Sequence, residues 1–349
     1  IMHGGHWHSA FLDVNGFVWT CGRVSEGRLG IVRDSEERKE LIPQRIPTLA
    51  EIVQVTCGFA FTVCLDSNGK LWSFGNNRKG QLGQGDLETR QIPEVIQNLN
   101  SIVSVHSGCH HTLCMDHHSN IYGFGYNHKG QLAMNGKETV AAPRKIVFEG
   151  SCKEIACGGD HSAILTTNGT VYTCGSNTKG QLGRKICFTK RPTLETLEYL
   201  PPISSISCGY GNTFFISDVR ELYSAGFPNG VTQAATQFIF KVPLENVIAV
   251  APSYEDVICL TGDYKVWGFG PTQITPDEFA SSTEIRAISA TQVAFMMSGA
   301  NGSVYVCGEN EDGQLGLGDT CKREELVPLP QDFAQLLPQK NIRAKSARK

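Results

Sequence analysis

A motif of about 50 residues recurs along the chain, and an internal repeat of this length constrains the fold more strictly than any local pattern. Each copy begins with an alternating apolar strand that ends in a small residue and a glycine. A second strand, a tight turn and a third strand follow, and a proline precedes a fourth, edge-like strand. The clearest copies span residues 52–86, 102–136, 154–183 and 285–319.

Two short sequence motifs recur in the regular copies. The turn between the second and third strands carries Asn-Gly, for example Asn68-Gly69, and we expect a type I′ hairpin in which both residues have positive φ. After the third strand stands a loop of the type Asn-x-x-Gly-Gln-Leu-Gly. Its glycines should turn the backbone, and its leucine should plug the edge of the sheet. The loop occurs at residues 77–83, 127–133, 177–183 and 310–316.

The glycine that ends the third strand marks every copy. The markers are Gly22, Gly75, Gly125, Gly175, Gly226, Gly270 and Gly308. A four-stranded unit of this size cannot bury both faces alone, so it must stack on its neighbours. Radial stacking closes the array and leaves only short edges. The sequence therefore predicts an all-β fold, a seven-bladed β-propeller of four-stranded antiparallel blades.

The repeats leave no linker inside residues 1–330, which we interpret as one propeller. Blades five and six lack the Gly-Gln-Leu-Gly loop, and the first blade has little chain for an innermost strand, so the way the ring closes stays open. Residues 331–349 are basic and are expected to form a tail or a linker to domains outside this chain. The blade boundaries are placed at about 1–50, 51–100, 101–151, 152–202, 203–246, 247–284 and 285–330.

Composition excludes several classes of function. The net charge of −3 argues against broad nucleic-acid binding, and no apolar run approaches the roughly 18 residues of a membrane-spanning helix. The 13 cysteines are odd in number and none form Cys-x-x-Cys, so reduced thiols and a cytoplasmic or nuclear location are expected. The repeated His8, His111 and His161 are separated by a blade width each, which favours structural hydrogen bonds over a metal site.

No serine, histidine and aspartate set accompanies a nucleophile motif, and no phosphate-binding loop is present. We therefore expect no catalytic residues, no cofactor and no metal.

These repeats resemble the regulator of chromosome condensation repeat, whose family founder is the nucleotide exchange factor for the GTPase Ran. The resemblance rests on the motifs from Cys57-Gly58 to Gly85-Asp86, from Ser107 to Leu132, from Cys157 to Gly183 and from Cys307 to Asp319. It implies the propeller fold. Function is less constrained, since members include exchange factors, ciliary scaffolds, ubiquitin-ligase modules and a plant photoreceptor.

In a four-stranded meander the first and third connections emerge on one face of the ring, here called the loop face, and the second connection emerges on the other, the hairpin face. Basic loops of blades two to four should form an arc on the loop face and meet an acidic surface, although ordinary solvated loop charges are the alternative reading. The residues expected to contact a partner are Trp7, Phe59, Arg78, Lys79, His110, His128, Lys129, Asp160, Lys179 and Tyr210.

We interpret the chain as a non-catalytic protein-interaction module, a scaffold or client-recruiting propeller with a small GTPase as one candidate partner. The alternative is a guanine nucleotide exchange factor for a Ran- or Rho-type GTPase. By the resemblance, polar turn residues at the positions of Asp160 and His110 face the GTPase, and exchange needs an enlarged third connection as a wedge. The connections at 23–26, 76–79, 126–129, 176–179 and 309–312 are equally short, which favours the first reading.

Overall fold

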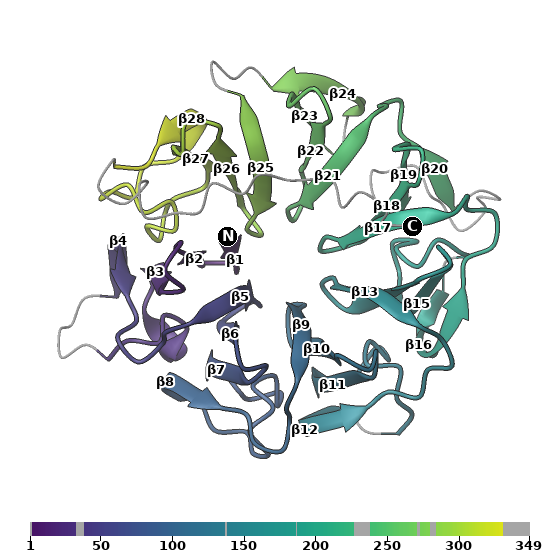
Figure 1. Ribbon diagram of the computed structural model, residues 1–349, viewed down its shortest axis with the longest axis horizontal. Coiled ribbons are helices and arrows are strands. Elements are labelled where there is room, and N and C mark those ends of the chain that lie inside the picture. Colours follow the sequence, from purple (N-terminus) through teal and green to yellow (C-terminus); the bar gives the residue numbers. More distant parts are fainter. Residues whose placement is uncertain are drawn as a thin grey trace.

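Seven four-stranded antiparallel sheets form a ring, which confirms the predicted β-propeller (Figure 1). The computed structural model describes residues 2–32, 38–136, 138–185, 187–226, 238–270, 273–279 and 284–330. The basic tail at 331–349 lies outside the described residues. Each sheet is built from four strands that are consecutive in sequence, so every repeat makes one blade.

Strands of equivalent position lie at equivalent distances from the ring axis (Figure 1). The innermost strands are β1 (Met2–Gly4), β5 (Ile52–Cys57), β9 (Ile102–Ser107), β13 (Cys152–Cys157), β17 (Ile203–Cys208), β21 (Val247–Pro252) and β25 (Ile285–Ala290). The second strands are β2 (His8–Leu12), β6 (Phe61–Asp66), β10 (His111–Asp116), β14 (His161–Thr166), β18 (Asn212–Ser217), β22 (Val257–Thr261) and β26 (Ala294–Gly299).

The outer half of each blade completes the meander. The third strands are β3 (Val18–Arg23), β7 (Leu71–Gly75), β11 (Ile121–Tyr126), β15 (Val171–Asn177), β19 (Leu222–Gly226), β23 (Val266–Gly270) and β27 (Val304–Gly308). The outermost strands are β4 (Lys39–Arg45), β8 (Arg90–Val95), β12 (Thr139–Lys145), β16 (Cys187–Thr196), β20 (Ile239–Lys241), β24 (Gln273–Phe279) and β28 (Arg323–Pro328). One short 3-10 turn, η1 (Ser25–Gly27), follows β3.

The Asn-Gly hairpins differ from the expected type I′ turn. Of the pair Asn68-Gly69, only the glycine has a positive φ, at 76°. Gly69 N donates to Asp66 O at 3.1 Å, and the Asp66 carboxylate accepts the backbone N–H groups of Asn68 and Lys70, both at 2.9 Å. The aspartate satisfies the donors of the turn itself, so the asparagine does not need the left-handed conformation.

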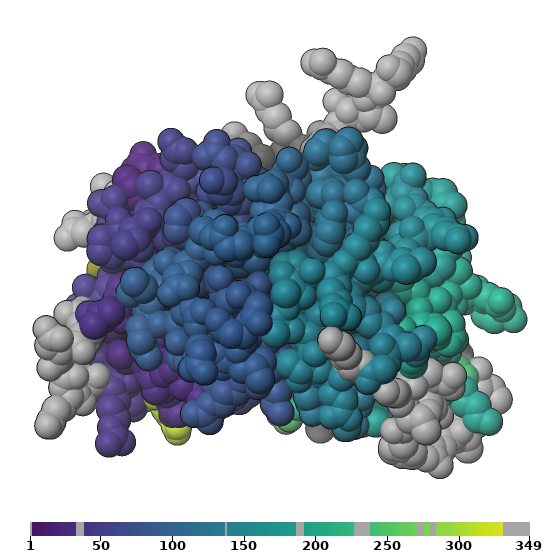
Figure 2. All heavy atoms as spheres, turned by 90° about the horizontal axis from the view of Figure 1, so that it is seen from below, coloured from purple at the N-terminus to yellow at the C-terminus, as the bar shows by residue number. Residues whose placement is uncertain are grey.

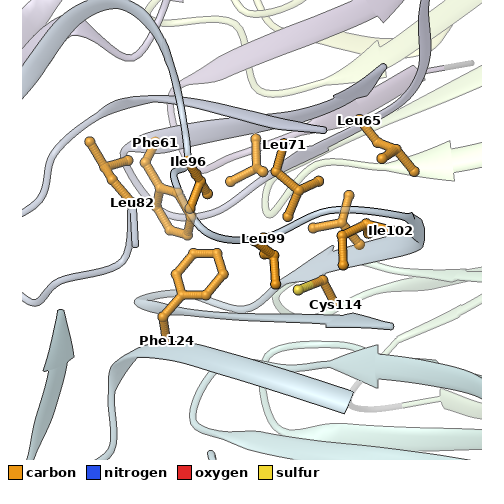
Figure 3. Close-up of a cluster of buried hydrophobic side chains, with 11 residues drawn as sticks. Phe61, Leu65, Leu71, Leu82, Ile96, Leu99, Ile102, Cys114 and Phe124 are labelled. Atoms are coloured by element: carbon orange, nitrogen blue, oxygen red, sulfur yellow. The ribbon is translucent and has the colours of Figure 1, made fainter. Parts of the chain in front are cut away.

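The hydrophobic core is divided among the junctions between blades. The cluster between blades two and three contains Phe61 and Leu82 from one blade and Phe124 from the next, all with 0% exposure (Figure 3). Leu82 belongs to the Gly-Gln-Leu-Gly loop, and its burial confirms the predicted plug. Gly83 follows at φ 69°, and a Cβ atom there would lie 2.9 Å from the Phe124 ring, so this position requires glycine.

The ring closes without exchange of strands. The three residues of β1 pair with β2, and Ser289 Oγ of the last blade donates to Met2 O at 2.8 Å. Ser9 Oγ donates to Gln314 O at 2.7 Å on the same junction. Arg23 adds two bonds to the Asp312 carboxylate, at 3.0 and 2.9 Å. The first innermost strand is short, as expected, and side chains hold the junction. Viewed from its edge the molecule is a thick disc (Figure 2).

Candidate functional site

The first connections of the blades form a ring of backbone hydrogen bonds around the axis. In most blades the second residue of the turn donates its N–H to a carbonyl in the turn of the next blade. The bonds run from His6 N to Phe59 O (3.4 Å), Phe59 N to Cys109 O (3.0 Å), Cys109 N to Gly159 O (3.3 Å), Gly159 N to Tyr210 O (3.2 Å), Tyr254 N to Gln292 O (2.8 Å) and Gln292 N to Gly5 O (3.2 Å). This ring fixes the turns relative to one another.

The third connections lie on the same face as these turns. The residue after the marker glycine of the third strand donates its N–H to the turn of its own blade, as Asn76 N does to Ala60 O at 2.9 Å and Ser176 N does to Asp160 O at 2.8 Å. The His-bearing and Gln-Leu-bearing segments therefore share the loop face, which is the arrangement that the meander predicts.

Aromatic side chains gather on this face around the axis, and we call them the aromatic crown. It consists of His6, Trp7, Phe59, His110, Tyr210 and Tyr254. Ring centroids of Trp7 and Phe59 lie 4.9 Å apart, and those of Phe59 and His110 lie 5.5 Å apart. Three residues that the sequence placed on separate blades thus form one cluster. His6, which sequence reasoning missed, stacks on Phe59 at 4.7 Å.

Tyr210 forms a second part of the crown with Tyr254 of blade six. Their ring centroids lie 4.2 Å apart, and Tyr254 is 38% exposed. The Lys179 ammonium lies 5.2 Å from the Tyr210 ring centroid and 5.7 Å from that of Tyr254. Burial, the first of several causes, raises the pKa of Tyr210 to about 12, so its hydroxyl stays a hydrogen-bond donor at neutral pH. Lys179 is held in place rather than freely solvated.

The remaining members of the basic arc occupy blades two and three. The Lys79 ammonium lies 4.6 Å from the Tyr126 ring centroid, and His128 stacks on the same ring at 5.6 Å. Arg78 is exposed and Lys129 is half-buried. Among the described residues, none of the three lysines forms an ion pair with an acidic side chain. His128, another member of the arc, lies 3.5 Å from Glu138 Oε1.

Asp160 and His110, a member of the crown, are held in defined states by their surroundings. Asp160 accepts a hydrogen bond from Gln131 Nε2 at 3.2 Å, so its carboxylate is oriented by the loop of the preceding blade. Burial is the main cause that lowers the pKa of His110, which keeps this side chain neutral at pH 7.

Two features of the loop face could not be predicted from the repeated motifs. Arg28 replaces the usual glutamine of its loop, is fully buried, and pairs with Glu26 at 2.9 Å while its guanidinium lies 5.4 Å from the Trp7 centroid. On blades six and seven, Glu255 and Glu311 are exposed on the loop face. Exposed basic residues thus stand on blades two to four of this face and exposed glutamates on blades six and seven, a division that our sequence reasoning missed.

The repeated histidines join neighbouring blades. His161 Nε2 bonds Thr213 Oγ1 at 2.9 Å, and that hydroxyl donates to Gln181 O at 2.7 Å. Because the hydroxyl proton goes to the carbonyl, Nε2–H must be the donor to the hydroxyl oxygen. His8 with Thr62 and His111 with Ser162 repeat the arrangement, at 3.0 and 2.9 Å. The interpretation of these residues as structural hydrogen-bonding histidines is confirmed.

Comparison with known proteins identifies the family. A profile described as "RCC1-like domain" matches residues 2–237, and one described as "Regulator of chromosome condensation (RCC1) repeat" matches residues 301–345. The chain belongs to the RCC1-like propeller family. Within the described residues, no helix is long and apolar enough to cross a membrane.

Individual relatives share short segments or the fold with this RCC1-like chain. It is 41% identical over 69 residues to the regulator of chromosome condensation of Mus musculus, covering 20% of this chain and 16% of that protein. It is 39% identical over 80 residues to a secretion-regulating guanine nucleotide exchange factor of Bos taurus, covering 23% and 17%. The structure of Prp20p from Saccharomyces cerevisiae superposes with a TM-score of 0.79 at 18% identity, over 93% of this chain and 88% of that one.

Proposed function

We propose that this RCC1-like propeller is a protein-interaction module that binds an acidic protein surface with its loop face. The aromatic crown carries the proposal, because aromatic side chains at the centre of a face, surrounded by charged residues, have the composition of a binding hot spot. Lys79, Lys129 and Lys179 supply the complementary charge. The ten residues named from the sequence remain the proposed contact set, to which we add His6 and Tyr254.

The proposed partner class includes a small GTPase, and the proposed location is the cytoplasm or nucleus. Prp20p, whose fold this chain shares, is described as having binding properties to Gsp1p and histones. Asp160 and His110 occupy the loop face, where the family resemblance places GTPase contacts. The described cysteines are free thiols, which fits a reducing compartment. Residues 1–330 would act as one domain, and residues 331–349 would form a basic tail or a linker.

Nucleotide exchange is the competing function. Connections at 76–79, 126–129, 176–179 and 309–312 are equally short, and the connection at 227–237 lies outside the described residues. The decisive assay measures release of a fluorescent nucleotide from a loaded Ran-type GTPase. Stoichiometric capture without acceleration supports a binding module, whereas faster release at catalytic amounts of the propeller would establish an exchange factor.

Reversing the charge of the arc should weaken partner binding. With a partner identified by affinity purification and mass spectrometry, we expect Lys79→Glu, Lys129→Glu and Lys179→Glu together to reduce affinity by about a hundredfold. The loss of two exposed cation–π contacts should lower the free energy of unfolding by about 1–2 kcal/mol. Surface plasmon resonance measures the first effect and urea unfolding the second.

A charge-matched control uses the hairpin face. Lys70 and Lys265 are exposed on the second connections and Lys145 at the hairpin-face end of β12, so reversing all three changes the net charge equally. Binding should then change by less than about threefold, since these sites lie far from the loop face. Equal losses in both triple variants would show that net charge, rather than the arc, governs binding.

A further inference from the structure

Side chains take the place of a β-ladder between the innermost strands around the axis. Gln54 of β5 extends its carboxamide to β9, where Nε2 donates to Val105 O at 2.7 Å and Oε1 accepts from Val105 N at 3.2 Å. Each innermost strand has a free backbone edge, and its N–H and C=O groups need partners. A single amide that both donates and accepts satisfies one N–H and one C=O of the neighbouring blade.

Blade four places a carboxyl group at the position of that amide. Glu154 pairs with Leu165 in β14 as Gln54 pairs with Leu65 in β6. Glu154 Oε1 accepts from Ser205 Oγ of β17 at 3.1 Å, and the backbone of Ile206 is among the groups that lower the pKa of the carboxyl. Ile206 is the equivalent of Val105, because it pairs with Phe215 as Val105 pairs with Cys114. The carboxyl therefore bonds blade five beside the residue that the amide of Gln54 contacts in blade three.

The donor half depends on protonation. An ionised carboxylate can only accept hydrogen bonds, whereas a protonated carboxyl has one O–H to donate. We propose that Glu154 is a proton-dependent joint between blades four and five. Its protonated form bridges to Ile206 as Gln54 bridges to Val105, and its ionised form loses the donor bond and leaves a charge in the wall of the ring. The joint connects β13 and β17, the strands that lead into the turns with Asp160 and Tyr210.

The surroundings of Glu154 favour a proton near neutral pH. Burial has the largest effect on the pKa of this carboxyl and raises it to about 7. The contacts with Ser205 and Ile206 and the charge of Lys153 act in the opposite direction and lower the pKa. Lys153 is the nearby cation, and its ammonium donates to Ser204 O at 2.6 Å. The thiols of Cys152 and Cys208 lie within electrostatic range of Glu154 and stay protonated, because burial raises the pKa of both, that of Cys152 to about 12.

The axial cavity gives the carboxyl a route to solvent protons. Glu154 lines this cavity of about 290 Å³, to which all seven blades contribute. His3 and His106 line the same cavity, and burial lowers the pKa of each to about 4, so both are neutral where Glu154 titrates. Among the described residues of the cavity wall, Glu154 is therefore the group that changes charge near pH 7.

The test compares wild-type protein with Glu154→Gln and the reciprocal Gln54→Glu by urea unfolding between about pH 4.5 and pH 8. Since the native carboxyl has the higher pKa, its stabilising effect is complete below about pH 4.5 and is lost as the pH rises through about 7. The unfolding constant of wild type, divided by that of Glu154→Gln, should rise about a hundredfold over this range. Gln54→Glu should acquire a second pH dependence of the same sign.

Hydrogen exchange measured by mass spectrometry locates the effect. In wild type, protection of β17 should fall as the pH rises, after correction for intrinsic exchange, and Glu154→Gln should abolish the fall. In Gln54→Glu the same loss should occur at β9. A constant ratio of unfolding constants between wild type and Glu154→Gln would overturn the proposal. If Glu154→Gln does not fold, the pKa of Glu154 can be measured in the wild-type protein from the ¹³C chemical shift of its carboxyl group. A Glu154 that titrates below about pH 5 would refute the proposed joint.

Discussion

Leu82→Ala is expected to lower the free energy of unfolding by about 3 kcal/mol, measured by urea denaturation. Leu82 is fully buried between blades two and three and packs with Phe61 and Phe124 (Figure 3). Its backbone is pinned on both sides, since Leu82 N donates to Asn77 Oδ1 at 3.0 Å and Leu82 O accepts from Ser73 Oγ at 2.8 Å. The loop cannot move inward to fill the space, so the cavity persists and its full cost is felt.

The matched control is Leu87→Ala in the same connection. Leu87 is 49% exposed, and the same substitution there should cost less than about 0.5 kcal/mol. A loss at position 87 as large as that at position 82 would mean that the loop is not a plug of the blade junction. The comparison removes side-chain chemistry as a variable and leaves burial between blades as the cause.

The repeat made the architecture predictable, because a sheet with two apolar faces has few ways to bury both. The marker glycines, the plug leucines and the structural histidines all followed from the periodicity. The turn type did not follow. Asn68-Gly69 has the signature of a type I′ turn, but Asp66, two residues before Asn68, supplies the acceptors that stabilise another geometry. The turn type was therefore determined by the Asp66 side chain rather than by the Asn-Gly dipeptide.

The candidate site was predictable wherever the repeat is regular. Trp7, Phe59 and His110 come together because each occupies a turn of the same kind. Tyr254 was missed because blade six has Ser253 in place of the turn glycine and no Gly-Gln-Leu-Gly loop to mark it. The strand pairing of Pro252 with Val257 restores the register and places Tyr254 in its turn. Counting residues from the preceding strand would have found it.

The contacts of the lysines in the arc could not be predicted from the spacing of the repeats. The residue before the first loop glycine contacts the next blade in blades one, two, four and seven. In blades two and four it is Lys79 or Lys179, which contacts an aromatic ring. In blade one it is Glu26, which accepts from Asn76 Nδ2 at 2.7 Å, and in blade seven it is Asp312. The sign of the charge at this position therefore matches the residue that it contacts in the next blade, so part of this charge serves the blade junction.

Arg23→Ala should open the junction at which the ring closes and lower the free energy of unfolding by about 2–3 kcal/mol. The Asp312 side chain is 4% exposed, and Arg23 supplies its two shortest contacts, whereas Lys39 lies at 3.8 Å. Removing the guanidinium leaves a buried carboxylate without its principal partner, and it also removes a cation 4.3 Å from the Trp7 centroid. Urea denaturation measures the loss, and hydrogen exchange should place it in β1 and β25.

Two further variants separate the buried charge from lost packing. Arg90 also makes two carboxylate contacts, but its partners Asp86 and Glu94 are 41% and 47% exposed, so Arg90→Ala should cost less than about 1 kcal/mol. Adding Asp312→Asn to Arg23→Ala removes the stranded charge and should recover part of the stability. If the double variant is less stable than Arg23→Ala, the guanidinium acts through packing alone. The closing junction depends on this pair because β1 has only three residues to contribute.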